Sequence, residues 1–389
     1  MKKIISLIIA LAMIMISMVT AFAVPYRKKE LKFNEDGKFK IVNMCDIQED
    51  YPLHPGTVEF IREVLAQEKP DLVVLGGDNC SAGREYVEAG IEEICNLFVE
   101  SGTYFTFVFG NHDEEQGFSK EDLLEMYYKY GGKYCLAFDE KPELSGTATH
   151  SLPIKSSTSD KTAFNLYMID SNMYVYDDDG NNLGWDNVHE DEIEWYKDTA
   201  AKLKAENGGK AVPSMVFQHI VVPEIYDELY VKDKLFNGKL GIDLEEEDYT
   251  FIPRLSGLLF KIKDGFLLEH PCPGYRNYGQ FDAMVETGDV LAVFSGHDHS
   301  NSFTVNINGV DIVNSPACSV VRGTALSRGC RVIELNENDL TTYSSHVITV
   351  NEMSLQDGST ILDLTGQSRF YTWIMVAFLK VLGFFRDVI

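Results

Sequence analysis

Basic residues are scarce in this sequence. The 389 residues include 34 Lys and Arg against 60 Asp and Glu, which gives a formal net charge of -26 at pH 7. A field of this sign repels polyanions, so nonspecific binding to nucleic acid is excluded. Hydrophobic residues make up 45% of the chain, enough for a sizeable core, which excludes a disordered protein. We therefore expect a folded globular protein without a nucleic-acid partner.

Cysteines at metal-binding or redox spacing are also lacking. The seven cysteines are spread along the chain without a CxxC pair, and an odd number cannot all pair within one chain. This excludes a zinc ribbon and a complete disulfide framework. Cys45 and Cys80 flank acidic residues that matter below, and we interpret both as small buried hydrophobes.

Long apolar runs are few, and the first has the features of an export signal. Lys2 and Lys3 precede the run Ile4 to Val19, and Ala21-Phe22-Ala23 has the small-x-small pattern of a cleavage site. We expect residues 1–23 to be removed, leaving an extracytoplasmic protein that is secreted or associated with the cell surface. A retained anchor is the alternative, because the run approaches the length of a membrane span.

A second apolar run lies near the C-terminus. Residues Phe370 to Phe385 are strongly apolar, with Arg369 and Arg386 at the flanks. A helix packed on the core is the simplest interpretation, and an interfacial membrane helix follows closely, because aromatic residues with basic flanks suit the headgroup boundary. A true span is the least favoured, being short and interrupted. We treat residues 351–389 as a C-terminal extension in which Phe370 to Ile389 is a candidate for peripheral membrane contact.

Apolar and β-branched runs alternate with amphipathic stretches over residues 39–218. This rhythm is typical of βαβ units and a parallel sheet, so the sequence predicts an α/β fold. The expected strands are Lys40–Cys45, Leu72–Leu75, Tyr104–Phe109, Asn165–Ile169, Ser214–Phe217 and Val290–Phe294. The expected helices, with apolar residues at spacings of three and four, are Thr57–Gln67, Arg84–Glu100, Lys120–Tyr130 and Glu190–Lys204.

The last third of the chain predicts antiparallel strands. Asn308-Gly309 favours a type I′ turn and therefore a hairpin. The expected strands here are Phe303–Ile307, Val310–Val313, Arg331–Leu335 and Tyr343–Val350. Residues 139–161 are rich in Ser, Thr, Lys and Pro, which predicts a surface insertion rather than a domain boundary. One domain, residues 24–350, is expected.

Five apolar runs end abruptly in residues that bind metals or move protons. The segments that follow the runs are Asp46-Ile47-Gln48, Gly76-Gly77-Asp78-Asn79, Gly110-Asn111-His112-Asp113, Gln218-His219 and Ser295-Gly296-His297-Asp298-His299. Ligands of open α/β sheets bind beyond the carboxyl ends of strands, so the five junctions are expected to converge on one crevice. Carboxylate, amide and imidazole groups without thiolates suit two divalent or trivalent ions such as zinc, iron or manganese.

The motifs D-x-Q, G-G-D-N, G-N-H-D, a later His and G-H-D-H-x-N, in this order, resemble the calcineurin-like metallophosphoesterase superfamily, which includes purple acid phosphatases. The resemblance spans Phe39 to Leu335. It implies two mixed β-sheets packed as a sandwich and flanked by helices, a four-layer arrangement, with a dinuclear metal centre at the strand ends. The purely parallel sheet would then be replaced by mixed sheets.

By position, the resemblance implies two metal sites that share Asp78. The first site would contain Asp46, Gln48, Asp78 and His299, and the second Asp78, Asn111, His219 and His297. Two ions about 3.5–4 Å apart would clamp the phosphoryl oxygens and lower the pKa of a bridging water. Asn111 and His112 would contact the substrate, and His112 would protonate the leaving oxygen. Asp113 is a candidate to orient His112.

The main departure from the family pattern is Gln48, where most members have His. An amide oxygen is a weaker, neutral ligand, so we expect weakened metal binding at the first site rather than lost function. His54 is a conceivable substitute ligand, but we interpret it as a loop histidine.

These observations favour an exported metal-dependent phosphohydrolase that acts on small phosphoesters, with monoesters slightly preferred. Two bound ions would invert the negative local potential, so the net charge does not exclude a phosphate substrate. A phosphodiesterase or nucleotidase on the same centre is the alternative. A catalytically weakened surface protein with a structural metal site is another, although such a site has no need of His112.

Overall fold

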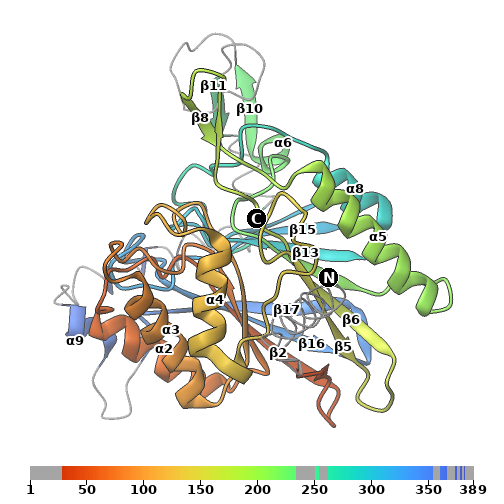
Figure 1. Ribbon diagram of the computed structural model, residues 1–389, viewed down its shortest axis with the longest axis horizontal. Helices are drawn as coiled ribbons and strands as arrows, with labels where there is room; N and C mark the ends of the chain where they lie inside the picture. The colour runs from red at the N-terminus through yellow and green to blue at the C-terminus, as the bar shows by residue number, and fades with distance from the viewer. Residues whose placement is uncertain are drawn as a thin grey trace, which may run out of the picture.

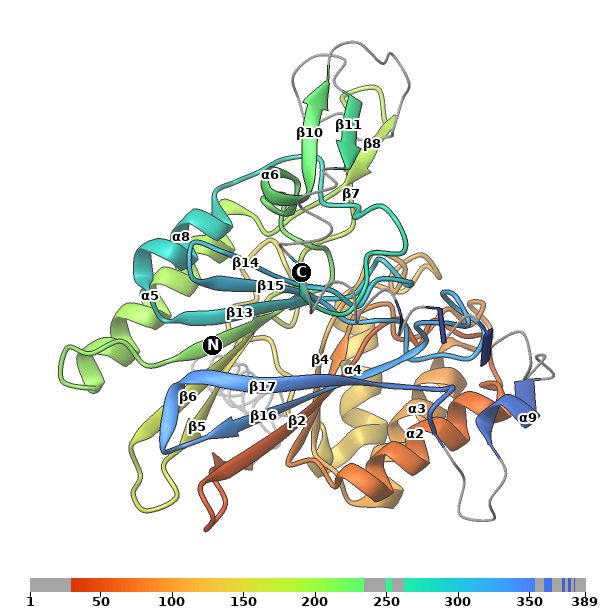
Figure 2. The ribbon, with the colours of Figure 1, turned by 180° about the vertical axis from the view of Figure 1, so that it is seen from behind.

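Two β-sheets packed face to face, with helices on both outer faces, form the protein (Figures 1 and 2). The computed structural model describes residues 29–233, 250–253, 262–353, 360–365, 373–374, 377–378 and 381. Within these residues the smaller sheet has five strands, in the order β17 (Asp339–Thr349), β16 (Gly329–Asn336), β2 (Lys38–Met44), β3 (Leu72–Gly76) and β4 (Phe105–Val108).

The larger sheet has eight strands over the same described residues. Their order is β1 (Leu31–Lys32), β5 (His150–Lys155), β6 (Thr162–Met168), β9 (Ser214–Phe217), β13 (Val290–Ser295), β15 (Val310–Asn314), β14 (Thr304–Ile307) and β12 (Ile262–Asp264). Both sheets mix parallel and antiparallel pairs. The predicted α/β fold with two mixed sheets is confirmed.

Helices cover the two outer faces. On the smaller sheet lie α2 (Pro55–Glu68), α3 (Val87–Ser101) and α4 (Lys120–Gly131), and on the larger sheet lie α5 (Glu190–Glu206) and α8 (Gln280–Thr287) (Figure 1). Short elements complete the described chain: η1 (Gly132–Tyr134), α6 (Ile225–Leu229), α9 (Ile361–Thr365) and two antiparallel strand pairs, β7 (Tyr174–Tyr176) with β8 (Asn182–Trp185) and β10 (Tyr230–Asp233) with β11 (Thr250–Pro253).

Alternating side chains of the strands build three separate cores. In β2, Ile41 faces the other sheet, whereas Val42 and Met44 face the helices. In β9, Phe217 packs between the sheets and Val216 packs under α5 and α8. Successive strand residues point to opposite faces, so strands buried on both sides need nearly continuous apolar runs. This explains why the runs before the candidate ligands are so uniformly apolar.

Strand direction brings the candidate ligands to one edge. β2, β3 and β4 pair in parallel in the smaller sheet, as do β6, β9 and β13 in the larger one. Parallel neighbours end at the same edge of a sheet, where ligands of α/β proteins bind. The loops after β2, β3, β4, β9 and β13 are the five junctions singled out above.

The expected strands and helices are present, with two corrections. The predicted surface insertion at 139–161 is wrong in part, because His150–Lys155 forms β5, whose Leu152 and Ile154 are buried between the sheets. The helix expected from Arg84 begins at Val87, because Tyr86 N–H donates to the Gly83 carbonyl (2.7 Å) in a turn before the helix.

Two predictions concern parts of the chain outside the described residues. The signal peptide at 1–23 lies wholly outside, and so does most of Phe370 to Ile389. Within the parts that the structure describes, no helix is both long and apolar enough to cross a bilayer. Met353 and Ile361 belong to the core under α2 and α3, so packing continues beyond residue 350.

All seven cysteines are free thiols, and all but Cys272 are buried. Burial raises the pKa of Cys45, and it raises the pKa of Cys80 to about 12. Both thiols therefore stay neutral and contribute as small apolar groups, in agreement with the interpretation from sequence.

A buried polar network joins α4, α5 and the end of β6. Lys120 Nζ bonds both oxygens of Asp170 (2.9 and 2.7 Å). The nearby Glu192 carboxyl group accepts from Thr149 Oγ1 (2.9 Å) and Asn172 Nδ2 (3.1 Å). Burial, reinforced by Asp170, raises the pKa of Glu192 to about 8. This carboxyl group is therefore protonated in the folded protein at neutral pH.

Glu192→Gln keeps the shape of this side chain and removes its titration. The pKa in the folded protein, about 8, exceeds the ordinary 4.5, so the folded state retains a proton that the unfolded state loses. Stability from this group is complete below pH 4.5 and falls as the pH rises to about 8. In urea unfolding we expect the wild type to lose, between pH 5 and 9, on the order of 3 kcal/mol more than Glu192→Gln.

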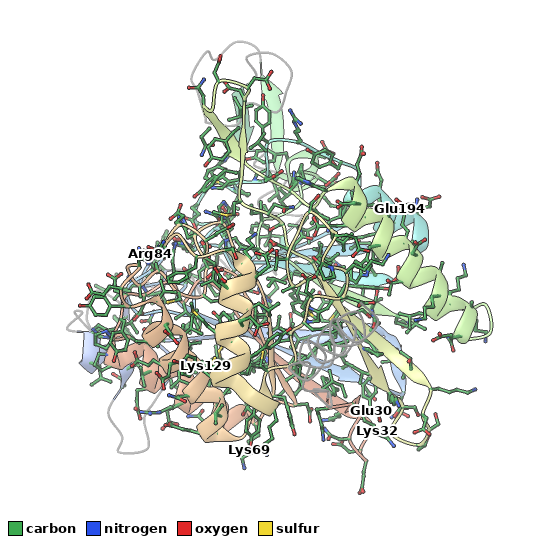
Figure 3. All side chains as sticks on the ribbon, viewed as in Figure 1. Glu30, Lys32, Lys69, Arg84, Lys129 and Glu194 are labelled. Carbon is green, nitrogen blue, oxygen red and sulfur yellow. The ribbon has the colours of Figure 1, made fainter. Side chains whose placement is uncertain are left out.

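The matched control is Glu194→Gln, an exposed position on the same helix (Figure 3). It should keep the pH dependence of the wild type. Parallel stability curves for the wild type and Glu192→Gln would show that Glu192 is ionised in the folded protein.

Candidate metal centre

Hydrogen bonds join the ligand-bearing loops within each sheet and also connect the two sheets. Asp46 N–H, after β2, donates to the Gly77 carbonyl after β3 (3.0 Å). Gly296 N–H, after β13, donates to the His219 carbonyl after β9 (3.0 Å). His297 N–H then donates to both carboxylate oxygens of Asp46 (3.2 and 3.1 Å), which connects the larger sheet to the smaller one. The junctions therefore form one site at the seam between the sheets.

Acidic and imidazole side chains gather there in two clusters that share one carboxylate. Asp78, His219 and His297 form one cluster, and Asp46, Asp78 and His299 form the other. In each, the candidate ligand atoms all lie within 4.8 Å of one another. Asp78 is thus placed to bridge two ions, as the resemblance implied.

Five buried acceptor atoms of the ligand-bearing loops have no hydrogen-bond partner among the described residues. Asn79 Oδ1 and Asp298 Oδ2 are two of them, and the other three are Gln48 Oε1, Asn111 Oδ1 and His219 Nε2. A buried lone pair without a partner is costly, and such atoms are normally satisfied by protein, water or an ion. The last three belong to residues expected to bind metal from the sequence. The donor set of amide, imidazole and carboxylate groups therefore fits two metal ions.

The ring of His219 is oriented by the backbone. Its Nδ1 lies 2.9 Å from the Gly76 carbonyl, which can only accept, so Nδ1 carries the proton. Nε2 is then left facing Asp78 Oδ2 at 3.2 Å and Asp46 Oδ1 at 3.9 Å. A metal ion between these atoms would use the Nε2 lone pair, and the Gly76 carbonyl would fix the ring from behind.

The charge distribution of the site calls for a cation. Burial lowers the pKa of His219, but Asp78 and Asp46 outweigh burial and raise that pKa to about 10. Without a metal ion, Nε2 of His219 would therefore carry a proton between the two carboxylates, and an ion bound there would take the place of that proton and use the lone pair. Burial, together with His219, lowers the pKa of His297, and burial lowers the pKa of His299 to about 4. Both rings are thus neutral, the form that binds metals.

The backbone at the ligands is held in an uncommon conformation. Asp46, Gln48, Asp78 and His297 have φ values of 52°, 42°, 50° and 67°. Left-handed backbone costs free energy for residues other than glycine and is found mainly at functional sites. At Gly110 a Cβ atom would overlap Asp78, so the close approach of these two loops requires glycine.

The suggestion that Asp113 orients His112 is wrong. The Asp113 carboxylate accepts backbone N–H groups from Asn79 (2.9 Å), Cys80 (3.3 Å) and Gly110 (2.8 Å). It therefore clamps the loops after β3 and β4 together. The ring of His112 instead lies against Glu115, with Nδ1 at 2.7 Å from Oε2.

His54 is a helix cap rather than a substitute ligand. It is the N-cap residue of α2, and its Nδ1 accepts Gly56 N–H at 3.0 Å. Pro55 follows at the first helical position, where its missing N–H costs nothing. The interpretation as a loop histidine therefore holds, and the amide of Gln48 is the group placed beside Asp78, with Nε2 3.5 Å from Oδ2.

Three neighbours of the site were not found from the sequence. Tyr174, from β7, accepts Asn111 Nδ2–H at its hydroxyl (3.1 Å), and the ring of Trp185, from β8, packs edge to face on His297 with centroids 5.0 Å apart. Arg322 donates from Nε to the Gln48 carbonyl (2.6 Å). These residues lie tens to hundreds of positions away from the ligands that they contact, in irregular or short elements, so no spacing pattern marks them.

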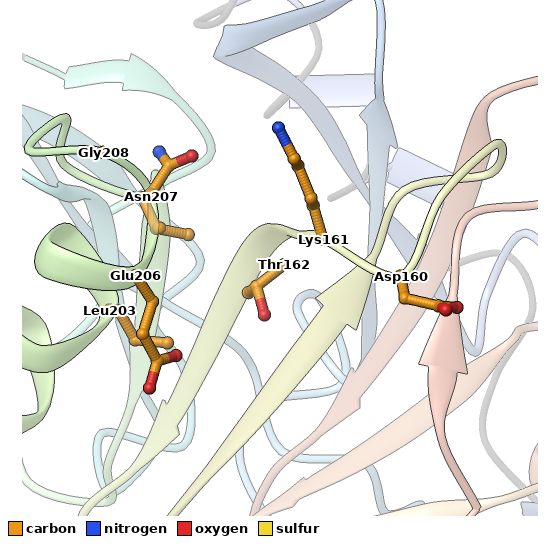
Figure 4. Close-up of a pocket in the computed structure, with 8 residues that line it drawn as sticks. Asp160, Lys161, Thr162, Leu203, Glu206, Asn207 and Gly208 are labelled. Carbon is orange, nitrogen blue, oxygen red and sulfur yellow. The ribbon is translucent and has the colours of Figure 1, made fainter.

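Cavities also lie outside the ligand cluster. A groove of about 880 Å³, lined partly by Glu49, Leu53, His54 and Arg322, adjoins the loop of Gln48. A second cavity, of about 450 Å³, lies between the end of α5 and the β5–β6 connection and contains no candidate site residue (Figure 4). Among the described residues, no candidate metal ligand lines either cavity, although the groove adjoins the loop of Gln48.

Known proteins resemble this chain over most of its length. Residues 39–301 match the family profile described as calcineurin-like phosphoesterase. The chain is 26% identical over 346 residues to probable inactive purple acid phosphatase 14 of Arabidopsis thaliana, covering 80% of this chain and 78% of that protein. It is also 26% identical to phosphatase DCR2 of Saccharomyces cerevisiae, covering 71% and 46%. Among solved structures, a dimetal phosphatase from Danio rerio has a TM-score of 0.47 at 12% identity, covering 77% and 93%.

Gln48→His tests whether the Gln48 side chain is a ligand. An imidazole binds borderline divalent ions more strongly than an amide oxygen, so we expect zinc or manganese at the first site to bind more tightly, by about 10-fold. Isothermal titration of the metal-free protein measures this change. Unaltered affinity and stoichiometry would show that Gln48 does not bind metal. His54→Ala is the control and should not alter metal affinity.

Proposed function

Because the chain belongs to the calcineurin-like phosphoesterase family, we propose that it is an exported metal-dependent phosphohydrolase. Water adds to phosphorus, the P–O bond to the leaving group breaks, and phosphate and an alcohol are released. Small phosphomonoesters are the favoured substrates. Phosphodiesters and nucleotides are the alternative on the same centre.

One observation carries the proposal. Two clusters of carboxylate and imidazole groups share Asp78, and the loops that carry them also hold three buried acceptors without hydrogen-bond partners, Gln48 Oε1, Asn111 Oδ1 and His219 Nε2. When bound, two ions would polarise the phosphoryl oxygens and lower the pKa of a bound water. Zinc, iron and manganese all suit this donor set.

The surrounding residues favour catalysis over a purely structural site. His112 is half-exposed at the rim of the cluster, and its backbone N–H donates to Asp78 Oδ1 (2.8 Å), which places it beside the bridging carboxylate. As the P–O bond breaks, the electron pair goes to the leaving oxygen, which takes a proton from His112.

A noncatalytic surface protein with a structural metal site is the second candidate. It is favoured by the name of the Arabidopsis relative, which marks that protein as probable inactive. It is also favoured by Gln48, a weaker ligand than imidazole. The two candidates differ in turnover, not in metal content.

The substitution Asp78→Asn tests which of the two candidate functions is correct. With the wild type from Val24 onward and added zinc, manganese or iron, we expect hydrolysis of para-nitrophenyl phosphate, and slower hydrolysis of bis-para-nitrophenyl phosphate. Asp78→Asn removes the only carboxylate of the cluster with His219 and His297 and one of the two carboxylates of the other cluster, so we expect activity to fall by about 10³-fold or more. Folded, metal-loaded wild type that hydrolyses neither ester would instead support the noncatalytic protein.

Export and membrane contact are proposed from the sequence ends. The run Ile4 to Val19 with Ala21-Phe22-Ala23 supports a cleaved signal, and the large exposed fractions of Trp373 (68%) and Phe378 (54%) support contact of the Phe370 to Ile389 segment with lipid. On expression of the full chain in a bacterium, we expect the exported protein to begin at Val24. Double substitution of Trp373 and Phe378 by Ala should release it from membranes. An intact N-terminus in the membrane fraction would indicate a retained anchor.

A further inference from the structure

The carboxylate of Glu115 connects two residues of the metal centre. Oε2 lies 2.7 Å from Nδ1 of His112. Oε1 accepts the hydroxyl of Tyr174 (2.8 Å), and that hydroxyl accepts Nδ2–H of Asn111 (3.1 Å). Both oxygens of one side chain are therefore used to hold residues that the site requires.

These contacts fix which atoms face the centre. A carboxylate only accepts, so Nδ1 of His112 carries the proton toward Glu115, and Nε2 is the ring atom left for the substrate. In the same way, Asn111 directs its NH₂ group to Tyr174, which leaves Oδ1, buried and without a hydrogen-bond partner, as the atom free to bind a metal ion. Orientation of this kind is what residues behind metal ligands and catalytic histidines provide.

We propose that Glu115 is the positioning residue of the leaving-group acid His112, and that through Tyr174 it also orients Asn111. The proposal rests on the phosphohydrolase function proposed above. As the ester P–O bond breaks, its electron pair stays on the leaving oxygen, and Nε2–H of the His112 imidazolium supplies the proton of the new O–H bond, which leaves a neutral ring that keeps Nδ1–H on Glu115. Glu115 keeps Nε2 aimed at that oxygen and itself exchanges no proton.

Other acids near His112 do not fill this role. Asp113 is fully engaged by backbone N–H groups, and Glu114 has no hydrogen bond to the ring among the described contacts.

The turn that carries Glu115 is also held in place. Arg84 (Figure 3) donates from Nη1 to the carbonyls of Gln116 (3.4 Å) and Gly117 (2.5 Å).

The test compares esters that differ in their need for an acid. Para-nitrophenolate leaves readily without a proton, whereas phenolate from phenyl phosphate needs one. For Glu115→Ala we expect kcat on phenyl phosphate to fall by about 10- to 100-fold, and kcat on para-nitrophenyl phosphate to fall less than about 3-fold. Glu115→Gln, which still accepts from Nδ1, should restore much of the loss. Glu114→Ala, one position away, should behave like the wild type on both esters.

Tyr174→Phe separates the two contacts of Glu115. It removes the link to Asn111 and leaves the link to His112, so we expect weaker metal binding with an unchanged ratio between the two esters. Equal losses on both esters for Glu115→Ala, or no loss, would overturn the proposal, because a general structural defect does not depend on the leaving group.

A second measurement works without activity. In ¹⁵N NMR spectra of the histidine rings, assigned by His112→Gln, we expect an Nδ1–H signal of His112 protected from exchange in the wild type and lost in Glu115→Ala. If the wild type hydrolyses neither ester, the proposed function fails, and this signal alone shows whether Glu115 contacts the His112 ring. A His112 ring that carries a proton at Nε2 and none at Nδ1 would overturn the positioning role. An unchanged Nδ1–H signal in Glu115→Ala would overturn it as well.

Discussion

Asp46 and Asp78 are fully buried beside one another where the two sheets meet, and two such carboxylates need positive charge between them. The neutral rings of His297 and His299 do not supply it, and His219 supplies it only by holding a proton. Metal ions satisfy this requirement and also use the lone pairs that have no partner. The chemistry proposed for the protein follows from this one electrostatic constraint.

The fold supplies the means to meet that constraint. Three parallel strands of the smaller sheet and the parallel pair β9 and β13 of the larger sheet end at one seam, and apolar packing on both faces makes those strands rigid. The loops beyond them are short and strained, with left-handed backbone at four ligands. Asp113 then binds three backbone amides, which keeps the loops after β3 and β4 in place. Packing energy thus compensates for the cost of the strained site.

The strands and site residues that depend on a local sequence pattern could be predicted from the sequence alone. Ser214–Phe217 forms a strand with the predicted bounds, and the residues after the apolar runs meet at one edge because strand direction is set by the alternation of strands and helices. β5 was missed because Pro153 and the polar residues around it hide the alternation of Leu152 and Ile154. The contact of Tyr174 with Glu115 joins residues 59 positions apart through a short hairpin, and no local signal predicts such a pairing.

Anomalous X-ray diffraction at the metal absorption edges tests the central claim most directly. Crystals of the protein grown with zinc or manganese should show two anomalous peaks about 3.5–4 Å apart, one on each side of the Asp78 carboxylate. His219 and His297 should adjoin one peak, and Asp46 and His299 the other. A single peak, or two peaks away from Asp78, would contradict the dinuclear centre.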